Sequence, residues 1–221
     1  MRPVMPKYQP YNEATIETRN GALEAFQHAW PSFVAECRSV LGSELHYQAL
    51  LYHCLRAHGE IPSRQLGMNV KIWITEVISP HFRRFGEKKR PGYIGGFEPI
   101  PDVVIFEPEI DGDWRRRNYE NTLRHMLMAI EVKASERHLG RLRAGEIVDD
   151  ILKVDALREE ALHRGGSDLL PVVVVIDTAP EANERMTSYS RREVEAAARE
   201  QGVCLFYVSP SDESVILPDV S

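Results

Sequence analysis

Cysteine is scarce in this chain of 221 residues, and the three that occur form no pattern. Cys37, Cys54 and Cys204 lie far apart in apolar surroundings, without paired spacing. A disulfide framework needs paired cysteines, and a zinc site needs closely spaced Cys or His ligands. The sequence therefore predicts neither, and it indicates a reducing compartment.

Long apolar runs are also missing. No stretch reaches the roughly 20 consecutive apolar residues that a helix needs to cross a bilayer. The first residues, Met-Arg-Pro-Val-Met-Pro, lack the apolar core of a signal peptide. We therefore expect a cytoplasmic protein with no membrane partner.

Positive charge is not in excess, because 27 Lys and Arg residues stand against 33 Asp and Glu residues, a formal net charge of −6. This balance argues against a general polyanion binder, but clustered basic residues remain compatible with nucleic-acid binding. Two clusters and one helix residue are candidate phosphate contacts: Arg83, Arg84, Lys88 and Lys89; Arg137, Arg141 and Arg143; and Lys153. An exposed pair of Lys153 with Asp149 is the alternative for the last. A further run, Arg115 to Arg117, is explained equally well as a solvated loop.

A separate DNA-reading module is absent from the sequence. It contains no recognisable helix-turn-helix or zinc finger, so sequence specificity must come from loops or from another subunit. If the chain acts on DNA, we therefore expect a homodimer or a partner protein to supply specificity.

What the sequence does contain is two apolar runs that carry acidic residues. Residues 101 to 106 include Asp102, and residues 126 to 134 include Glu131. A carboxylate in a buried strand is unfavourable unless a cation or strong hydrogen bonds stabilise it. Two such strands predict a metal site.

The second run places its polar side chains together. Side chains alternate along a strand, so Glu131 and Lys133 point to one face and Val132 to the other. If the two strands are neighbours, Asp102 and Glu131 can share a divalent ion, with the carbonyl of Val132 as a further ligand. Oxygen ligands suit Mg²⁺ or Mn²⁺. Lys133 would then orient or deprotonate a water, or stabilise an anionic phosphorus centre, which predicts a phosphodiesterase site.

At these residues the sequence resembles the PD-(D/E)xK nuclease superfamily. The matching residues are Pro101-Asp102, Glu131-Val132-Lys133 and an upstream helix acid, Glu44. The resemblance implies Asp102 and Glu131 as metal ligands, Lys133 as the catalytic lysine and Glu44 as a supporting acid. It also implies a Mg²⁺-dependent endonuclease acting on DNA, in defence against foreign DNA or in DNA processing. An interaction with a helix N-terminus is the alternative role for Glu44.

The order of expected elements agrees with the restriction-endonuclease-like fold of that superfamily. We expect one α/β domain over residues 1 to 221, with residues 1 to 30 as an N-terminal arm and helix. Its core is a central mixed β-sheet flanked by helices, in the order αβββαβ plus a further helix and strand. The expected helices cover residues 15 to 41, 43 to 57, 145 to 163 and 190 to 201, with Pro31 suited to a helix start. The expected strands cover residues 69 to 77, 101 to 106, 126 to 134, 169 to 178 and 203 to 208. Within residues 80 to 99, which hold the first basic cluster, Pro91 to Gly96 are expected to be a flexible connection, and the residues after 208 are expected to be a tail.

Other interpretations remain open. Asp177 ends an apolar strand and is the rival catalytic acid of a doubly wound fold, which the three strands before the first crossover helix disfavour. Asp111 and Asp113 are an alternative metal pair, although acids are common in turns. A catalytically silent nuclease-fold module, which binds nucleic acid or scaffolds a larger complex, is the principal alternative to an enzyme.

Overall fold

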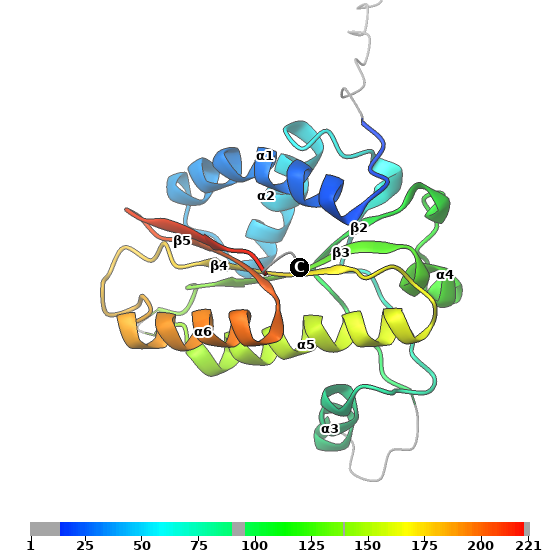
Figure 1. Ribbon diagram of the computed structural model, residues 1–221. Helices are drawn as coiled ribbons and strands as arrows, with labels where there is room; N and C mark the ends of the chain where they lie inside the picture. Colours follow the sequence, from blue (N-terminus) through cyan, green and yellow to red (C-terminus); the bar gives the residue numbers. More distant parts are fainter. Residues whose placement is uncertain (1–13, 90–95, 139, 219–221) are drawn as a thin grey trace, which may run out of the picture.

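The computed structural model describes residues 14–89, 96–138 and 140–218, without the side chains of Phe85, Lys88 and Lys89. It is an α/β structure in which a mixed β-sheet lies between two layers of helices (Figure 1). This confirms the expected mixed sheet flanked by helices. Residues 1–13 of the expected N-terminal arm lie outside the described residues.

The sheet has six strands in the described residues, and their spatial order is their order in the sequence. The strands are β1 (Leu66–Met68), β2 (Val103–Phe106), β3 (Met126–Ala134), β4 (Leu170–Ile176), β5 (Cys204–Val208) and β6 (Glu213–Ile216). Strands β1, β2 and β3 are antiparallel neighbours, and β3, β4 and β5 are parallel. Strand β6 returns antiparallel to β5.

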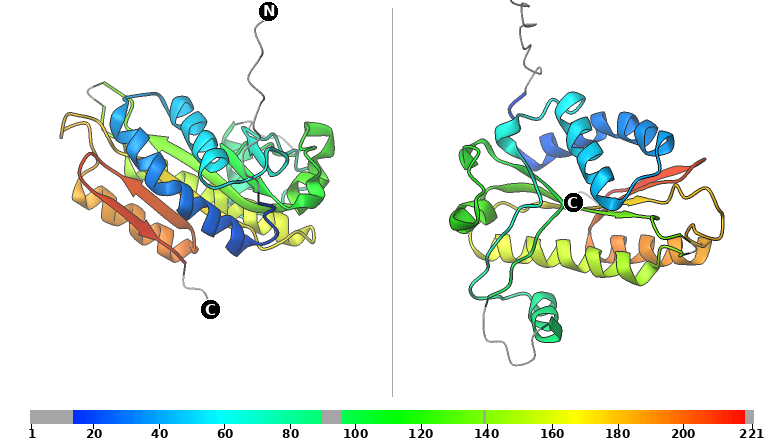
Figure 2. Two further views of the ribbon diagram at one scale, coloured as in Figure 1. Left: turned by 90° about the horizontal axis from the view of Figure 1, so that it is seen from above. Right: turned by 180° about the vertical axis from the view of Figure 1, so that it is seen from behind.

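Helices cover both faces of the sheet (Figures 1 and 2). One layer holds α1 (Arg19–Ser39) and α2 (Glu44–Ala57), and the other holds the crossover helices α5 (Ala144–His163) and α6 (Ser188–Gln201). The remaining helices are α3 (Pro80–Lys89) and the short α4 (Tyr119–Arg124), with 3₁₀ turns at Ser63–Gln65, Pro108–Ile110 and Arg116–Asn118. Helix α3 lies beyond α5, outside these layers.

Strand β4 explains why the sheet needs both layers. Its seven residues are all buried, and alternation sends Val172 and Val174 toward α1 and α2 but Val173 and Val175 toward α5 and α6. Burying one such side chain contributes about 1.5–3 kcal/mol. The continuous β-branched run is therefore a central strand, as expected from the sequence.

Pro31 does not begin a helix, contrary to the expectation. It lies inside α1, which begins at Arg19 after Thr18, whose Oγ1 accepts a hydrogen bond from the N–H of Gly21 at 3.1 Å. A proline inside a helix costs about 3 kcal/mol because it removes one hydrogen bond. Trp30 and Phe33 beside it are buried in the core, and their burial offsets that loss.

Residues 69 to 77 are not the first strand of the sheet. Asn69 has a φ of 51°, in the left-handed region, and ends β1 immediately after Met68. The segment beyond it makes one isolated bridge, between Ile74 and Phe97. The alternating Val70, Ile72 and Ile74 pack into the core that contains Phe82 and Phe106. The period of two therefore reflects burial of one side of an extended segment.

One further expectation is wrong, and one lies mostly outside the described residues. Residues 80–89, for which no helix was expected, form α3, whose Phe82 is buried in the core, while residues 90–95 of the expected flexible connection lie outside the described part of the chain. The expected tail contains β6, an edge strand with alternating exposed and half-buried residues. Its weak apolar content gave no strand signal.

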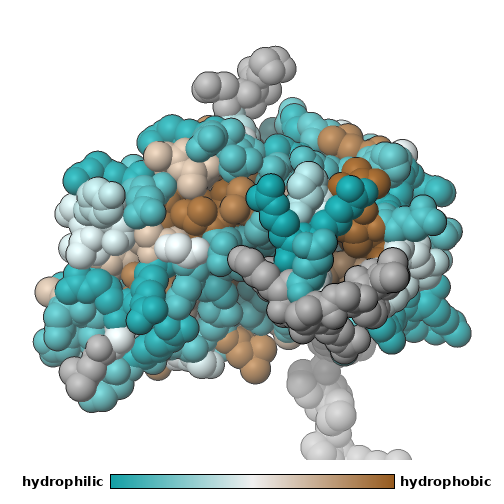
Figure 3. Space-filling view, turned by 90° about the horizontal axis from the view of Figure 1, so that it is seen from below, coloured by the Kyte–Doolittle hydropathy of each residue, from teal (hydrophilic) through white to brown (hydrophobic). Residues whose placement is uncertain are grey.

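The face that carries α3, α5 and α6 is mainly hydrophilic (Figure 3). Hydrophobic residues visible on it form small, separate patches rather than one broad surface. No helix in the described residues combines the length and the apolar content that crossing a membrane requires.

Candidate metal and catalytic site

Asp102 lies directly before the first residue of β2, and backbone hydrogen bonds fix its position. Its N–H donates to the carbonyl of Ile130 at 3.0 Å, and its carbonyl accepts from the N–H of Asn69 at 2.8 Å. Its carboxylate oxygen Oδ2 accepts a hydrogen bond of 2.7 Å from the N–H of Val132 in β3. Only 8% of Asp102 is exposed. The side chain is therefore directed at β3 by contacts on both sides of its backbone.

Glu131 is the neighbouring acid on β3. Because β2 and β3 pair Val103 with Ile130, Asp102 and Glu131 follow as the next residues outward on adjacent strands. Glu131 is 3% exposed, and Nζ of Lys153 lies 2.6 Å from its Oε1. That oxygen has no aligned hydrogen-bond donor among the described residues. A carboxylate is thus buried with one cation nearby and incomplete hydrogen bonding.

Burial shifts the pKa of both acids upward. It raises the pKa of Asp102 to about 6, although the N–H of Val132 and the charge of Lys153 oppose the shift. Burial also raises the pKa of Glu131 to about 8, against the opposing charge of Lys153 and with a contribution from the charge of Asp102. The two carboxyl groups therefore lie close enough to repel each other when ionised.

Lys133 lies between two further acids. Its Nζ is 3.2 Å from both carboxylate oxygens of Glu44 and 3.3 Å from Oδ2 of Asp150. Burial alone would lower the pKa of Lys133, but the charges of Asp150 and Glu44 outweigh it and raise that pKa above its ordinary value. Lys133 is therefore a fixed cation at neutral pH.

The position of Glu44 follows from how α2 begins. Its own N–H donates to Oε2 of Glu136 at 2.7 Å, which joins the first turn of α2 to the segment after β3. An acid near a helix N-terminus is favourable, and both Glu136 and Glu44 itself, in the first turn of α2, supply one here. Burial raises the pKa of Glu44, while Lys133 opposes the shift. The contact that places Glu44 in the site is with Lys133.

Asp150 belongs to the site and was missed by the sequence reasoning. It lies on α5, is 9% exposed, and its Oδ2 has no aligned hydrogen-bond donor among the described residues. Burial raises its pKa, opposed by Lys133 and Lys153. The available signal was the spacing of Asp150 and Lys153, three residues apart and therefore on one helix face. The sequence alone leaves Lys153 either as a phosphate contact or as a partner of Asp149, which is exposed.

The chemistry of these groups fits a divalent cation. Four carboxylates (Glu44, Asp102, Glu131 and Asp150) face two lysines (Lys133 and Lys153), which leaves an excess of two negative charges when all are ionised. The N–H and C=O of one strand residue point to the same side, so the carbonyl of Val132 points toward Asp102. Carboxylate and carbonyl oxygens are ligands that Mg²⁺ and Mn²⁺ accept.

The cluster after β3 borders the site. A hollow of about 310 Å³ is lined by Glu44, Lys133, Arg137 and Arg141, among others. Arg137 pairs with Glu146 at 2.9 Å, and the exposed Arg143 precedes the first residue of α5. Arg137 and Arg141 are therefore close to Lys133, as a phosphate-binding role requires.

The structure does not bring the first basic cluster to the site. Arg83 and Arg84 are exposed on α3, and Nε of Arg83 donates to the carbonyl of Val77 at 2.7 Å. Helix α3 lies beyond α5 in Figure 1 and in the right-hand view of Figure 2. The side chains of Lys88 and Lys89 lie outside the described part of the structure.

The alternative acids are each held by other groups. Asp113 binds Arg115 through two contacts of 2.6 Å, which lowers its pKa to about 2, and Asp111 pairs with Arg64. Asp177 accepts hydrogen bonds from the hydroxyl of Tyr207 at 2.8 Å and from the N–H of Met186 at 3.0 Å. These contacts give each acid a local partner.

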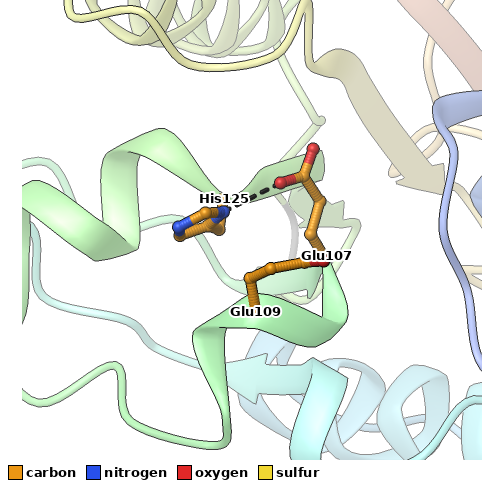
Figure 4. Close-up of side chains that lie close together, drawn as sticks. All are labelled: Glu107, Glu109 and His125. Atoms are coloured by element: carbon orange, nitrogen blue, oxygen red, sulfur yellow. Dashed lines mark hydrogen bonds and ion pairs between the residues drawn. The ribbon is translucent and has the colours of Figure 1, made fainter.

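A second cluster that could hold a metal lies at the other end of β2 (Figure 4). Glu107 follows β2, His125 precedes β3, and Glu109 completes the group. Nδ1 of His125 lies 2.8 Å from Oε2 of Glu107, and the hydroxyl of Ser167 donates to the other oxygen of Glu107. Glu109 is exposed. The two partners of Glu107 already satisfy its carboxylate, in contrast to Glu131.

In comparisons with known proteins, no family model, no curated protein and no solved structure matched this chain.

Proposed function

We propose that the protein is a divalent-metal-dependent nuclease that hydrolyses phosphodiester bonds in DNA. One observation carries the proposal: Asp102 and Glu131 are buried on adjacent strands beside the fixed cation Lys133. Buried acids of this kind need more positive charge than the nearby lysines supply. A metal ion and the phosphate of a substrate would complete the site.

The topology supports a restriction-endonuclease-like fold. Apart from α3 and α4, which lie between the first three strands, a helix is followed by three antiparallel strands, a crossover helix and a parallel strand. This is the αβββαβ order that the sequence resemblance implies. Asp102 directly precedes the second of these strands, and Glu131 and Lys133 lie on the third. Helix α6 with β5 supplies the further helix and strand, and β6 adds one more edge strand.

The metal-binding part of the proposal assigns three oxygen donors. Asp102, Glu131 and the carbonyl of Val132 would hold Mg²⁺ or Mn²⁺. The ion, when bound, lowers the pKa of a water and polarises a phosphoryl oxygen. Burial of the two carboxyls keeps solvent away, so their charge acts with little screening.

Lys133 has an electrostatic role in this proposal. Its raised pKa keeps it protonated at neutral pH, so it donates hydrogen bonds rather than accepting a proton from water. Glu44 and Asp150 hold its ammonium group from two helices. A cation fixed in advance where negative charge develops on phosphorus stabilises the transition state.

Arg137 and Arg141 supply the adjoining phosphate contacts. Both line the hollow that contains Lys133, and Arg141 is exposed. Contacts of Arg with phosphate fix the position of a nucleic acid without reading its sequence. A homodimer or a partner protein would supply specificity, in DNA processing or in defence against foreign DNA. Three free, buried cysteines support a cytoplasmic location.

A cleavage assay tests the proposal. Plasmid DNA, linear duplex, single-stranded DNA and RNA are incubated with the protein in Mg²⁺, Mn²⁺ or EDTA. We expect cleavage of DNA with metal only, and a loss of at least about a hundredfold in Glu131→Gln. Glu193→Gln, an exposed change on α6, is the matched control. Cleavage in EDTA, or equal cleavage by Glu131→Gln, contradicts the proposal.

A catalytically silent nucleic-acid-binding module is the second candidate. The observation in its favour is that Lys133 and Lys153 already pair with the acids of the site. The two lysines therefore neutralise part of the negative charge without a metal ion. For such a module, nucleic acid binds without cleavage and Mg²⁺ leaves the thermal stability unchanged. A nuclease gives the opposite result in both measurements.

A further inference from the structure

Two aromatic side chains outside the proposed catalytic site share a pair of adjoining hollows. Trp73 and Tyr119 both line a hollow of about 310 Å³, together with Thr75, Glu120, Leu123, Arg124 and Arg164. The same two rings line a more open hollow of about 490 Å³ with Arg116 and Arg117. Aromatic and arginine side chains are thus gathered on one surface, which we call the Trp73–Tyr119 surface.

The backbone holds Trp73 outward. Its neighbours Ile72 and Ile74 are fully buried, and their N–H groups donate to the carbonyls of Pro99 and Phe97. Alternation along this extended segment therefore turns the side chain of Trp73 away from the core, and it is half-buried. Tyr119, also half-buried, is the first residue of α4.

The charge on this surface favours an anionic ligand. The guanidinium of Arg116 lies 5.5 Å from the centre of the Trp73 ring and also pairs with Glu98. Arg117 and Arg124 are exposed, and no hydrogen bond or ion pair joins their guanidinium groups to another described residue. Glu120 is the acid on the rim of the smaller hollow.

Arg164 is committed to the protein itself. Its guanidinium binds the carboxylate of Glu160 and the carbonyl of Glu76. Glu160 is completely buried and also accepts hydrogen bonds of 2.8 Å from the N–H groups of Ile78 and Ser79. Arg164 therefore fixes the wall of the hollow, while Arg117 and Arg124 are available to a ligand.

We propose that the Trp73–Tyr119 surface binds an unpaired strand of nucleic acid, with bases stacked on Trp73 and Tyr119 and phosphates bound by Arg117 and Arg124. Stacking on aromatic rings within a basic groove is how proteins bind single strands without reading their sequence. Bases inside a duplex are already stacked on each other and cannot reach such rings. The inference rests on the proposed function in one respect: it assigns the nuclease a substrate that contains a single-stranded segment.

The surface is distinct from the catalytic residues. Tyr119 and Arg124 belong to α4, directly before β3 begins, whereas Glu131 and Lys133 lie five and seven residues further along β3. At about 3.3 Å per residue, this is roughly 17–23 Å along the strand. A strand bound on this surface can therefore reach the acids only by extending over several nucleotides.

Binding is measured apart from cleavage, in EDTA. A thymidine oligonucleotide of roughly ten nucleotides is titrated into the protein and tryptophan fluorescence is followed, since a base stacked on Trp73 quenches its emission. We expect saturable quenching, and at least about tenfold weaker binding, followed by fluorescence anisotropy of a labelled oligonucleotide, in Trp73→Ala and in Tyr119→Ala. Trp73→Phe keeps an aromatic ring, so it should bind nearly as wild type but without the quenching. Its binding would show that weak binding by Trp73→Ala results from lost stacking and not from unfolding.

The charge variants provide the second arm. Arg117→Glu with Arg124→Glu should weaken binding and reduce its dependence on salt. Tyr189→Ala and Arg192→Glu, both exposed changes on α6, are the matched controls and should bind as wild type. Blunt duplex bound as tightly as the oligonucleotide, polyglutamate bound as tightly, or wild-type affinity in Trp73→Ala each overturns the inference.

The two proposals fail in different ways. Metal-dependent cleavage of duplex DNA without oligonucleotide binding at Trp73 overturns the inference alone. Oligonucleotide binding that Trp73→Ala weakens, in a protein with no metal-dependent cleavage, overturns the nuclease and leaves the single-strand surface in place.

Discussion

Oδ2 of Asp102 accepts a hydrogen bond of 2.7 Å from the backbone N–H of Val132. This bond joins the start of β2 to β3. It directs the carboxyl group toward the side of β3 on which the carbonyl of Val132 lies. One carboxylate oxygen is used to fix the side chain. The other remains for a cation that Glu131 can share.

Replacing Asp102 by Asn separates folding from metal binding. Asn keeps an oxygen that accepts the hydrogen bond from Val132 but removes the charge that burial disfavours. We expect the free energy of unfolding of Asp102→Asn to lie within about 1 kcal/mol of the wild-type value or to exceed it. Cleavage should fall by at least about a hundredfold. Denaturation curves and cleavage rates on one preparation check both, and an active Asp102→Asn contradicts the assignment.

The stability of the metal-free protein should depend on pH in an unusual direction. Burial raises the pKa of Asp102 to about 6 and of Glu131 to about 8, above the values of about 3.9 and 4.3 in unfolded chains. The folded state then holds more protons than the unfolded state, so the contribution of these groups is present at low pH and is lost as pH rises to about 8. Each unit of difference between the folded and unfolded pKa values corresponds to about 1.4 kcal/mol in the free energy of unfolding.

Denaturation in EDTA between pH 5 and pH 8 checks this expectation. The loss of stability between pH 6 and pH 8 should be smaller in Glu131→Gln, because Gln does not ionise. An identical pH profile for Glu131→Gln and wild type contradicts the assigned role of Glu131.

Added metal should restore the stability that the metal-free protein loses as the pH rises. A ligand that binds only the folded state at a hundred times its dissociation constant stabilises it by about 2.7 kcal/mol. We therefore expect Mg²⁺ or Mn²⁺ to raise the melting temperature at pH 8 by several degrees, and to do so less at pH 5 because protons compete for the ligands. The melting temperature of Glu131→Gln should not respond.

Removing the ammonium group of Lys133 should affect turnover more than metal binding. Lys133→Met keeps the length of the side chain but leaves Glu44 and Asp150 without their shared cation. We expect cleavage to fall by about a hundredfold or more while the metal-induced rise in melting temperature remains. Loss of both responses would show that Lys133 acts mainly through structure.

Lys153 should compete with the metal. Its Nζ lies 2.6 Å from Oε1 of Glu131. In Lys153→Gln the carboxyl of Glu131 loses this cation, so the metal-free protein should be less stable and the stabilisation by Mn²⁺ larger than in wild type. Unchanged stabilisation by Mn²⁺ would instead support the phosphate-binding role considered for Lys153.

The acids and the lysine could be found in the sequence because each breaks a strong local pattern. Asp102 and Glu131 interrupt apolar runs that are otherwise typical of buried strands, and alternation places Lys133 on the same face as Glu131. The β-branched run of β4 and the glycine that ends α6 similarly have local causes. Gly202 has a φ of 61°, the left-handed conformation that favours glycine.

The remaining features depend on tertiary contacts. Asp150 differs from Asp149 by one position on α5, and only the packing of that helix against β3 decides which acid reaches Lys133. Val70, Ile72 and Ile74 alternate as a strand would, but the left-handed Asn69 ends β1 before them. Trp73 and Tyr119 are 46 positions apart in the sequence, so no local pattern relates them.

Direct titration of Mn²⁺, followed by electron paramagnetic resonance, tests the central assignment. Wild type should bind Mn²⁺ with an affinity that increases from pH 6 to pH 8, and Asp102→Asn with Glu131→Gln should abolish that binding. Glu107→Gln with His125→Ala, which changes the cluster at the other end of β2, should leave it intact. Binding that survives the first pair of changes, or that disappears with the second, contradicts a metal site at Asp102 and Glu131.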